Sequence, residues 1–186
     1  MNLTQFLHPD NTALTPASLK QIEKLEYLIG VRLPPDYRSF LLEVGGCSLR
    51  DTLVECTVPT PFGEHVLTEF FSVDEVIGSL YSGGIAQSGR VLTPRNMISI
   101  SYGHFGAITC LSIAGIDHGQ VFSLDTEMRF FWDHETLNAY PHLDPSVRGF
   151  FRLRDAHELP ERPWGYENCY HVADSFEEFV SKMYLA

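Results

Sequence analysis

This sequence of 186 residues has no apolar run approaching the roughly 18 residues that a membrane-spanning helix needs. Its first eight residues have neither the basic start nor the apolar core of a signal peptide. Both absences argue against insertion into a membrane or export through one. We therefore expect a cytoplasmic protein with no membrane partner.

Cysteine is also scarce, and the four cysteines are widely spaced: Cys47, Cys56, Cys110 and Cys169. No two of them form a C-x-x-C pair, and none has a histidine at metal-ligand spacing. The eight histidines form no H-x-x-x-H or H-E-x-x-H motif. The sequence therefore predicts reduced, mostly buried thiols, with no metal and no cofactor.

Basic residues are few: 13 lysines and arginines stand against 24 aspartates and glutamates, so the formal net charge is −11. Such a surface repels anionic membranes and the phosphates of nucleic acids, and it attracts basic partners. We therefore expect no nucleic-acid partner. Two interpretations of the charge stay open, the steering of a basic protein and simple solubility.

Motifs of the common enzyme classes are missing as well. Residues 111–115 lack the leading glycine of a G-x-S-x-G nucleophile elbow, and the glycine-rich residues 82–90 lack the G-K-[ST] ending of a phosphate-binding loop. The densest mixture of carboxylate and imidazole is Asp133, His134 and Glu135. A hydrolase using these three residues is an alternative, although a polar strand end explains them more simply. We predict no catalytic residue.

The chain does have apolar material for a core, since 44% of its residues are hydrophobic and 13 are phenylalanine. A globular chain of this length buries roughly 70% of the surface that its unfolded form exposes. We therefore expect one domain over residues 1–186.

Two helical patterns meet within residues 15–46. In the first, apolar residues recur every three to four positions from Leu19, and Gly30 ends the pattern. We expect Thr15 to cap this helix and Pro16 to occupy its first position.

The second helix is predicted to start at Pro34 and Pro35, which disfavour helix before them and suit a first helical turn. Its apolar stripe consists of four residues at helical spacing: Tyr37, Phe40, Leu41 and Val44. Gly45 and Gly46 supply a left-handed end.

Farther along the chain, residue type and turn signals predict a series of strands: 53–58, 66–71, 97–101, 107–113, 120–124 and 128–132. Ser72 with Glu75 forms a capping box for a short helix, and Ser175 with Glu178 forms another for a terminal helix. Residues 133–165 are polar and rich in proline and charge. This composition predicts a loop-rich elaboration with short helical turns.

Residues 33–46 (LPPDYRSFLLEVGG) and 173–179 (ADSFEEF) resemble the two ends of the SUKH superfamily, which includes a fungal cell-wall-synthesis regulator and many bacterial immunity proteins. The family usually has asparagine before its glycine pair, and Val44 stands there in this chain. The resemblance implies an α+β fold, in which an N-terminal helix pair and a C-terminal helix flank an antiparallel sheet. The structural signature implied by the resemblance comprises Pro34, Tyr37, Phe40, Gly45, Gly46 and Phe176.

The resemblance further implies a non-enzymatic module that binds a protein. Our leading hypothesis is an immunity protein that binds and neutralises a cognate toxin, and the negative charge favours a basic toxin domain such as a nuclease. The alternative within the family is an intracellular regulatory scaffold. We expect a monomer or a weak dimer.

Between Asp133 and Glu178, carboxylates are interleaved with aromatic residues, and this mixture suits a protein interface. We predict that the partner contacts six residues of this region: Asp133, Glu135, Asp155, Glu158, Glu161 and Trp164. The competing interpretation places the aromatic residues in the core and the acids on a solvated face.

Overall fold

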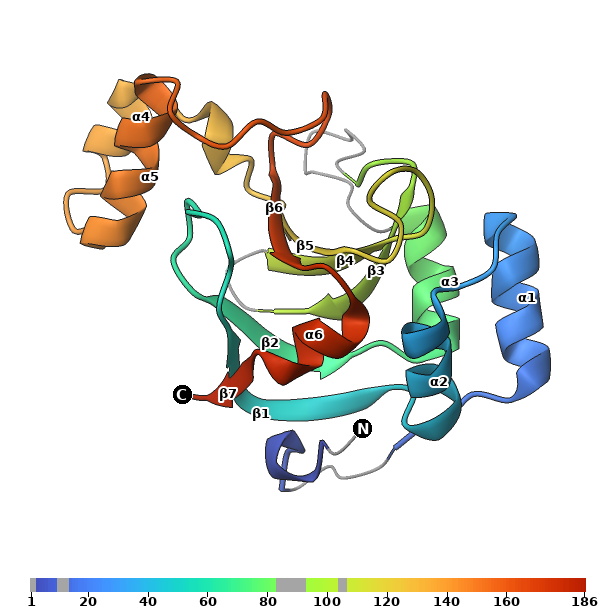
Figure 1. Cartoon of the computed structure of the whole chain (residues 1–186). Coiled ribbons are helices and arrows are strands. Elements are labelled where there is room, and N and C mark those ends of the chain that lie inside the picture. Colours follow the sequence, from blue (N-terminus) through green and yellow to red (C-terminus); the bar gives the residue numbers. More distant parts are fainter. Residues whose placement is uncertain (1–2, 10–13, 83–92, 104–106) are drawn as a thin grey trace.

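The computed structural model describes residues 3–9, 14–82, 93–103 and 107–186, with the backbone alone at residues 51, 82 and 107. In these ranges, seven strands form one antiparallel sheet with helices around it (Figure 1). The strands are β1 (Cys47–Val54), β2 (His65–Phe70), β3 (Met97–Tyr102), β4 (Ala107–Ser112), β5 (Val121–Asp125), β6 (Cys169–Ala173) and β7 (Met183–Leu185). The helices are α1 (Leu19–Ile29), α2 (Pro35–Glu43), α3 (Val73–Ser82), α4 (His134–Asn138), α5 (Pro145–Asp155) and α6 (Phe176–Ser181), with 3-10 turns η1 (Thr4–Phe6) and η3 (Arg129–Phe131). The predicted α+β class is confirmed.

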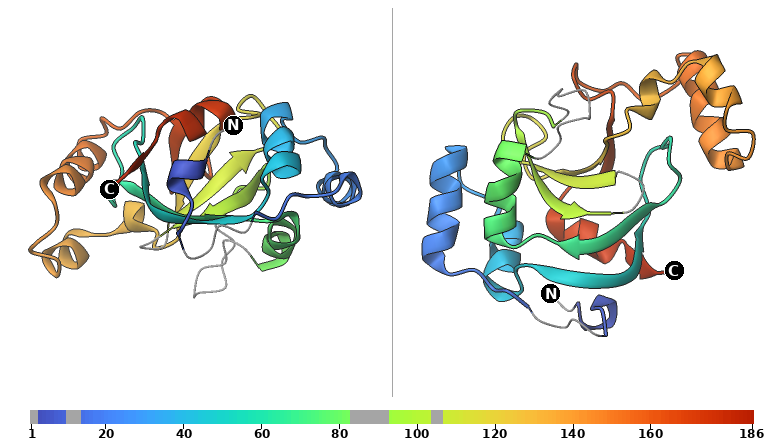
Figure 2. Two further views of the ribbon diagram at one scale, coloured as in Figure 1. Left: turned by 90° about the horizontal axis from the view of Figure 1, so that it is seen from below. Right: turned by 180° about the vertical axis from the view of Figure 1, so that it is seen from behind.

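The sheet has the strand order β6-β5-β4-β3-β2-β1-β7, and neighbouring strands run antiparallel. The chain therefore meanders from β1 to β6, and β7 returns to pair with β1. The sheet is curled, with α6 on its inner side (Figure 2). Among the strands that the structure describes, β6 lies at one edge of the sheet and pairs with β5. The sequence pattern does not predict β7, which is three residues long.

Aromatic rings from both ends of the chain form the centre of the core. The ring centroid of Phe40, on α2, lies 4.8 Å from that of Phe176 on α6 and 5.0 Å from that of Phe70 on β2. Tyr37 is fully buried, and its ring lies 5.0 Å from Phe176. Burying such a side chain stabilises a fold by roughly 1.5–3 kcal/mol. The apolar stripe of α2 therefore joins the terminal helix to the sheet.

The glycine pair after α2 lies where the N-terminal segment crosses it. Gly45 has a φ of 67°, and a Cβ there would lie 1.9 Å from the Thr15 carbonyl oxygen. A Cβ on Gly46 would lie 2.7 Å from the backbone nitrogen of Ser72. Thr15 binds Gly46 directly, since its backbone N–H and its hydroxyl both donate to the Gly46 carbonyl at 3.0 Å. These two positions therefore accept only glycine without a shift of the backbone.

The helix ends follow the predicted signals with one correction. α3 has the predicted capping box, in which the Ser72 backbone N–H donates to the Glu75 carboxylate at 2.7 Å. The predicted cap of the first helix is wrong, because α1 begins at Leu19 and is capped by Ser18 together with Gln21. The hydroxyl of Thr15 is instead engaged with the glycine pair. Gly30 ends α1 in the left-handed conformation, as predicted.

Residues 128–132 contain the short helix η3, and the predicted strand there is wrong. The carboxylate of Asp125 accepts hydrogen bonds from the backbone N–H groups of Glu127 (3.2 Å) and Arg129 (2.8 Å), which turns the chain at the end of β5. Met128 is left-handed, with a φ of 54°. The Arg129 guanidinium then pairs with the same carboxylate at 2.6 Å. Local turn chemistry therefore overrides the β-propensity of the aromatic residues.

The first predicted strand is displaced as well. The pattern predicts residues 53–58, whereas β1 begins directly after the glycine pair at Cys47 and ends at Val54. β2, predicted at 66–71, matches within one residue.

Residues 133–165 contain α4 and α5, which extend the predicted helical turns. The two helices lie at the end of the sheet opposite α1 and α3 (Figures 1 and 2). They have their own apolar cluster, in which Phe150 of α5 lies 5.7 Å from Tyr170 of β6 between ring centroids. This contact anchors α4 and α5, called the helix pair below, to the edge strand.

The glycine-rich residues 83–90 lie outside the described residues. All four cysteines are free, and all but Cys56 are buried. Across the ranges described, no helix is long and apolar enough to cross a membrane.

Candidate functional site

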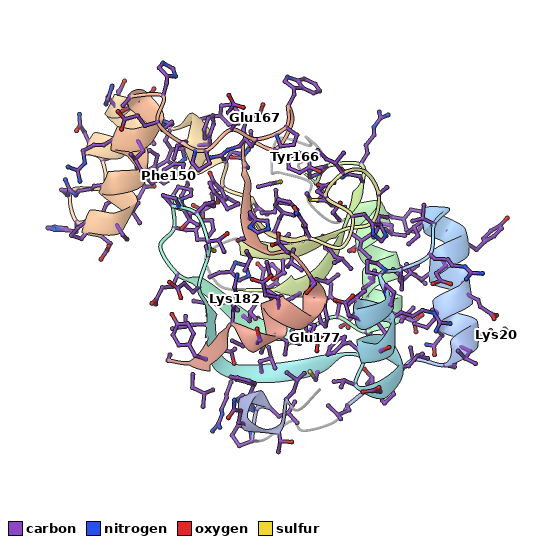
Figure 3. The ribbon with its side chains drawn as sticks, in the orientation of Figure 1. Lys20, Phe150, Tyr166, Glu167, Glu177 and Lys182 are labelled. Atoms are coloured by element: carbon purple, nitrogen blue, oxygen red, sulfur yellow. The ribbon has the colours of Figure 1, made fainter. Side chains whose placement is uncertain are left out.

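A hollow beside the edge strand β6 is the candidate site, and we call it the β6 pocket. Its volume is about 270 Å³. Apolar walls come from Val58, Phe122, Pro160, Pro163 and Tyr166, and the polar lining includes Asp117, Glu161, Arg162 and His171. Figure 3 shows Tyr166 and Glu167 in the segment that leads into β6, well away from Glu177 and Lys182 of α6. Segments distant in the sequence therefore meet in one concave surface.

The floor of the β6 pocket is a hydrogen-bond network around Asp117, a residue that is 9% exposed. The Tyr166 hydroxyl donates to Asp117 Oδ2 at 2.5 Å. The Asn96 amide donates to Asp117 Oδ1 at 3.3 Å and to the Tyr166 hydroxyl at 2.7 Å. The same amide donates to the Ala114 carbonyl at 3.1 Å, which fixes the turn that carries Asp117.

Tyr166 is more strongly protonated here than an exposed tyrosine. Burial raises the pKa of Tyr166 to about 12, and the hydrogen bond to Asp117 and the charge of that carboxylate add to the rise. Ionising the phenol would place a second negative charge beside the first. Tyr166 is therefore a hydrogen-bond donor to Asp117 at physiological pH.

His171, on β6, forms one wall of the pocket. Its Nε2 lies 3.1 Å from Asp174 Oδ1, and its Nδ1 lies 2.8 Å from Thr57 Oγ1. Thr57 also donates to the His171 carbonyl at 2.8 Å, and Lys182 Nζ donates to the Val172 carbonyl at 2.8 Å. Side chains that occupy backbone carbonyls of an edge strand hinder its pairing with another chain.

Thr57, His171 and Asp174 stand in the order of hydroxyl, imidazole and carboxylate that many hydrolases use. A threonine hydroxyl has a single proton, however, and here it points at the His171 carbonyl. The same Thr57 oxygen lies 2.8 Å from His171 Nδ1, so the hydroxyl contacts both the backbone and the ring of one residue of the edge strand. We interpret the three residues as a tie between the segment after β1 and the edge strand.

Arg162 also lines the pocket, but its guanidinium is already engaged. Its Nη1 donates to the Glu167 carbonyl at 2.8 Å. Its Cζ lies 5.4 Å from the ring centroid of Phe130 and 5.1 Å from that of Tyr170. Such cation–π contacts stabilise by about 0.5–2 kcal/mol each. Arg162 therefore fixes the segment between α5 and β6 against the apolar cluster of α5.

Three of the six residues predicted to bind the partner lie on α4 and α5. Asp133 caps α4 by accepting from the Thr136 backbone N–H at 2.7 Å, and this hydrogen bond lowers the pKa of Asp133. Glu135 is exposed in the first turn of α4. Asp155, the last residue of α5, is exposed and pairs with Arg154 Nη2 at 2.8 Å.

The other three follow α5 in the chain. Glu158 and Glu161 are exposed, and Trp164 is 95% exposed. Of the six, Glu161 lines the β6 pocket, and Trp164 directly follows Pro163 of its wall. The structure therefore places three of the six residues on or next to α4 and α5, and one of the other three, Glu161, in the lining of the β6 pocket.

The residues considered for a hydrolase lie on the surface of the helix pair. His134 Nε2 is 3.9 Å from Asp155 Oδ2, beyond hydrogen-bond distance, and 84% of its side chain is exposed. Asp133 is committed to capping α4. Within the part of the chain that the structure describes, no group of three or more His, Cys, Asp or Glu is placed to hold a metal ion.

Sequence reasoning missed the floor of the pocket. Asn96 and Asp117 are 21 residues apart, and Asn96 and Tyr166 are 70 apart, so no local motif connects them. The one available signal was the glycine-bounded turn at residues 115–119, where a buried aspartate needs partners from elsewhere.

Known proteins match this chain over a region that includes the candidate site. Residues 16–182 match the model of the SMI1 / KNR4 family (SUKH-1). Over 176 residues the chain is 28% identical to the SPbeta prophage-derived uncharacterized protein YokK of Bacillus subtilis (strain 168). That alignment covers 87% of this chain and 71% of the relative. The family match includes every residue that lines the β6 pocket.

Proposed function

Because this chain belongs to the SMI1 / KNR4 family (SUKH-1), we propose that it is a non-enzymatic protein-binding module, and specifically an immunity protein that neutralises a cognate toxin. The partner is a basic protein domain, such as a nuclease. The module acts as one domain over residues 1–186, with residues 133–165 as an elaboration, and as a monomer or weak dimer.

The observation that carries this proposal is the distribution of charge over residues 133–165. Three of the four arginines of this segment use their guanidinium groups on backbone carbonyls. Arg148 donates to the carbonyls of Pro141 and Leu143, Arg154 to those of Phe130 and Trp132, and Arg162 to that of Glu167. The carboxylates of Glu135, Glu158 and Glu161 are exposed. A basic partner therefore meets these exposed carboxylates, together with the exposed arginines Arg148 and Arg152.

The mechanism is occlusion of the toxin's active site. Exposed carboxylates raise the association rate and fix the orientation of a basic partner. Aromatic side chains supply the buried anchors of such interfaces, and Trp164, 95% exposed, is placed to act as one. Asp133, Glu135 and Asp155 on the helix pair extend the acidic surface.

Co-expression with the product of the neighbouring reading frame, which the proposal takes to be the toxin gene, tests the proposal. We expect the cell to survive and the two proteins to elute as one complex from a sizing column. Glu158→Lys and Glu161→Lys should each raise the Kd about fivefold or more, with unchanged thermal stability. The matched control is Glu23→Lys, which reverses an exposed charge on α1, at the other end of the sheet.

Three outcomes would contradict the proposal. Cell death at an excess of this protein, with no complex, excludes the immunity function. A stable complex with a protein of the cell's own regulatory machinery, and none with a toxin, favours the scaffold alternative. A hydrolytic activity of the purified protein that His134→Ala removes favours the enzyme alternative.

A further inference from the structure

The size of the β6 pocket restricts what it can hold. Sites for drug-sized ligands are clefts of roughly 300–1,000 Å³, and this hollow measures about 270 Å³. It lies on the surface beside exposed apolar residues, since Ile116 is 100% exposed and lines it. A hollow of this size beside such residues suits a single side chain of a docked protein better than a free metabolite.

The walls suit the apolar stem of a long side chain. Phe122 and Tyr166 are each 7% exposed, and their rings meet edge to face with centroids 5.6 Å apart. Pro160 and Pro163 add further apolar surface to the lining. Long basic side chains place their methylene groups along apolar surfaces of this kind while the charged head reaches a polar partner.

The charges of the lining favour a cation. Asp117 and Glu161 both line the pocket. Among the described residues Glu161 has no hydrogen-bond or ion-pair partner. The basic side chains of the lining are already engaged, Arg162 by the Glu167 carbonyl and two rings, and His171 by Thr57 and Asp174. Arg162 keeps its positive charge but is half-buried against the apolar cluster, and Asp117 already accepts hydrogen bonds from Tyr166 and Asn96. The exposed carboxylate of Glu161 is therefore the charge of the lining that is most open to a ligand.

We propose that the β6 pocket receives one arginine or lysine side chain of the bound protein, with its stem against Phe122 and Tyr166 and its cationic head toward Asp117 and Glu161. This inference rests on the proposed function, because the toxin domain supplies that side chain. Trp164 and Ile116, beside the pocket, then pack on the backbone that carries it.

Titration of the isotope-labelled full chain with small probes, followed by NMR, tests the inference without any toxin. The probes are the Nα-acetyl amides of arginine, lysine, leucine and glutamate. We expect the arginine and lysine probes to shift the resonances of Tyr166, Ile116 and the Trp164 indole in a saturable way. The leucine and glutamate probes should shift them weakly or not at all. The two basic probes also reveal which head group binds more tightly.

Substitutions then show which carboxylate binds the cationic head of the probe. Glu161→Gln should weaken binding of the arginine probe about two- to fivefold, the effect of removing one exposed ion pair. Glu158→Gln is the matched control, because Glu158 is an exposed carboxylate three residues away that does not line the pocket. Asp117→Asn should weaken binding about tenfold or more. A thermal melt of that variant shows whether the network with Asn96 and Tyr166 survives.

Three results would overturn the inference. The first is an equal response to the leucine probe, which would make the pocket an apolar anchor site. The second is no saturable shift from any probe, and the third is an equal loss of binding in Glu158→Gln and Glu161→Gln. A toxin complex that tolerates Glu161→Gln and Asp117→Asn would refute the inference and leave the proposed function standing. Binding of the basic probes without any toxin complex would contradict the proposed function and leave the binding of a basic side chain in the pocket standing.

Discussion

At the scale of single residues, Gly45 has the least room of any described glycine. A Cβ there would lie 1.9 Å from the Thr15 carbonyl oxygen, whereas Gly30, with a similar φ of 75°, has open space around it. We expect Gly45→Ala to lower the free energy of unfolding by about 3 kcal/mol or more, because left-handed strain and a backbone clash add. Gly30→Ala should cost about 1 kcal/mol, the strain alone. Urea unfolding measures both, and equal losses would mean that the Thr15 segment moves away freely.

His65 is a residue whose pKa is changed by folding. It is fully buried, with Nδ1 2.6 Å from Ser123 Oγ and Nε2 2.9 Å from Thr109 Oγ1. Burial lowers the pKa of His65 from 6.5 to about 4. The unfolded chain therefore binds a proton between these two values that the folded chain does not bind. Stability contributed by the neutral imidazole is complete above about pH 6.5 and is lost as the pH falls toward 4.

The expected loss is about 2 kcal/mol between pH 7 and pH 5, from the two pKa values by linkage. Urea unfolding across this range measures it. His65→Gln, which cannot titrate, should flatten the dependence even where its absolute stability is lower. A slope that His65→Gln leaves unchanged would assign the effect to other groups.

At the scale of secondary-structure elements, the sequence predicts those with strong local chemistry. The capping residues Ser72 and Glu75 correctly start α3, and the glycine pair correctly ends α2. Errors arise where a distant or side-chain interaction decides. β7 exists because three residues pair with β1, and η3 exists because the Asp125 carboxylate binds the backbone of the following turn. Neither interaction produces a periodic spacing of apolar residues in the sequence.

The candidate site is less predictable than the fold for the same reason. Its walls come from strand β5, the turn after β4 and the segment before β6, which only the completed sheet brings together. Of the residues that line the pocket, the sequence singled out Glu161, and it did so by composition alone. It could not identify Asp117, because the sequence around an aspartate in a turn does not show whether its carboxylate is exposed to solvent or buried. In the folded chain Asp117 is buried and forms the centre of a hydrogen-bond network.

At the scale of the whole molecule, the net charge of −11 predicts that the proposed binding of a basic toxin depends on salt. Charges on separated surfaces attract over about 10 Å at 0.1 M salt and over about 3 Å at 1 M. We therefore expect the association rate constant, measured by stopped flow with the purified toxin domain, to fall by about tenfold or more across this range. The dissociation rate should change little, because contacts inside the interface are screened less.

Glu23→Lys, remote from the predicted interface, should reduce the association rate less than Glu161→Lys does, although both change the net charge equally. An association rate that is insensitive to salt would assign the negative charge to solubility alone, and the partner would then be recognised by shape and apolar contact.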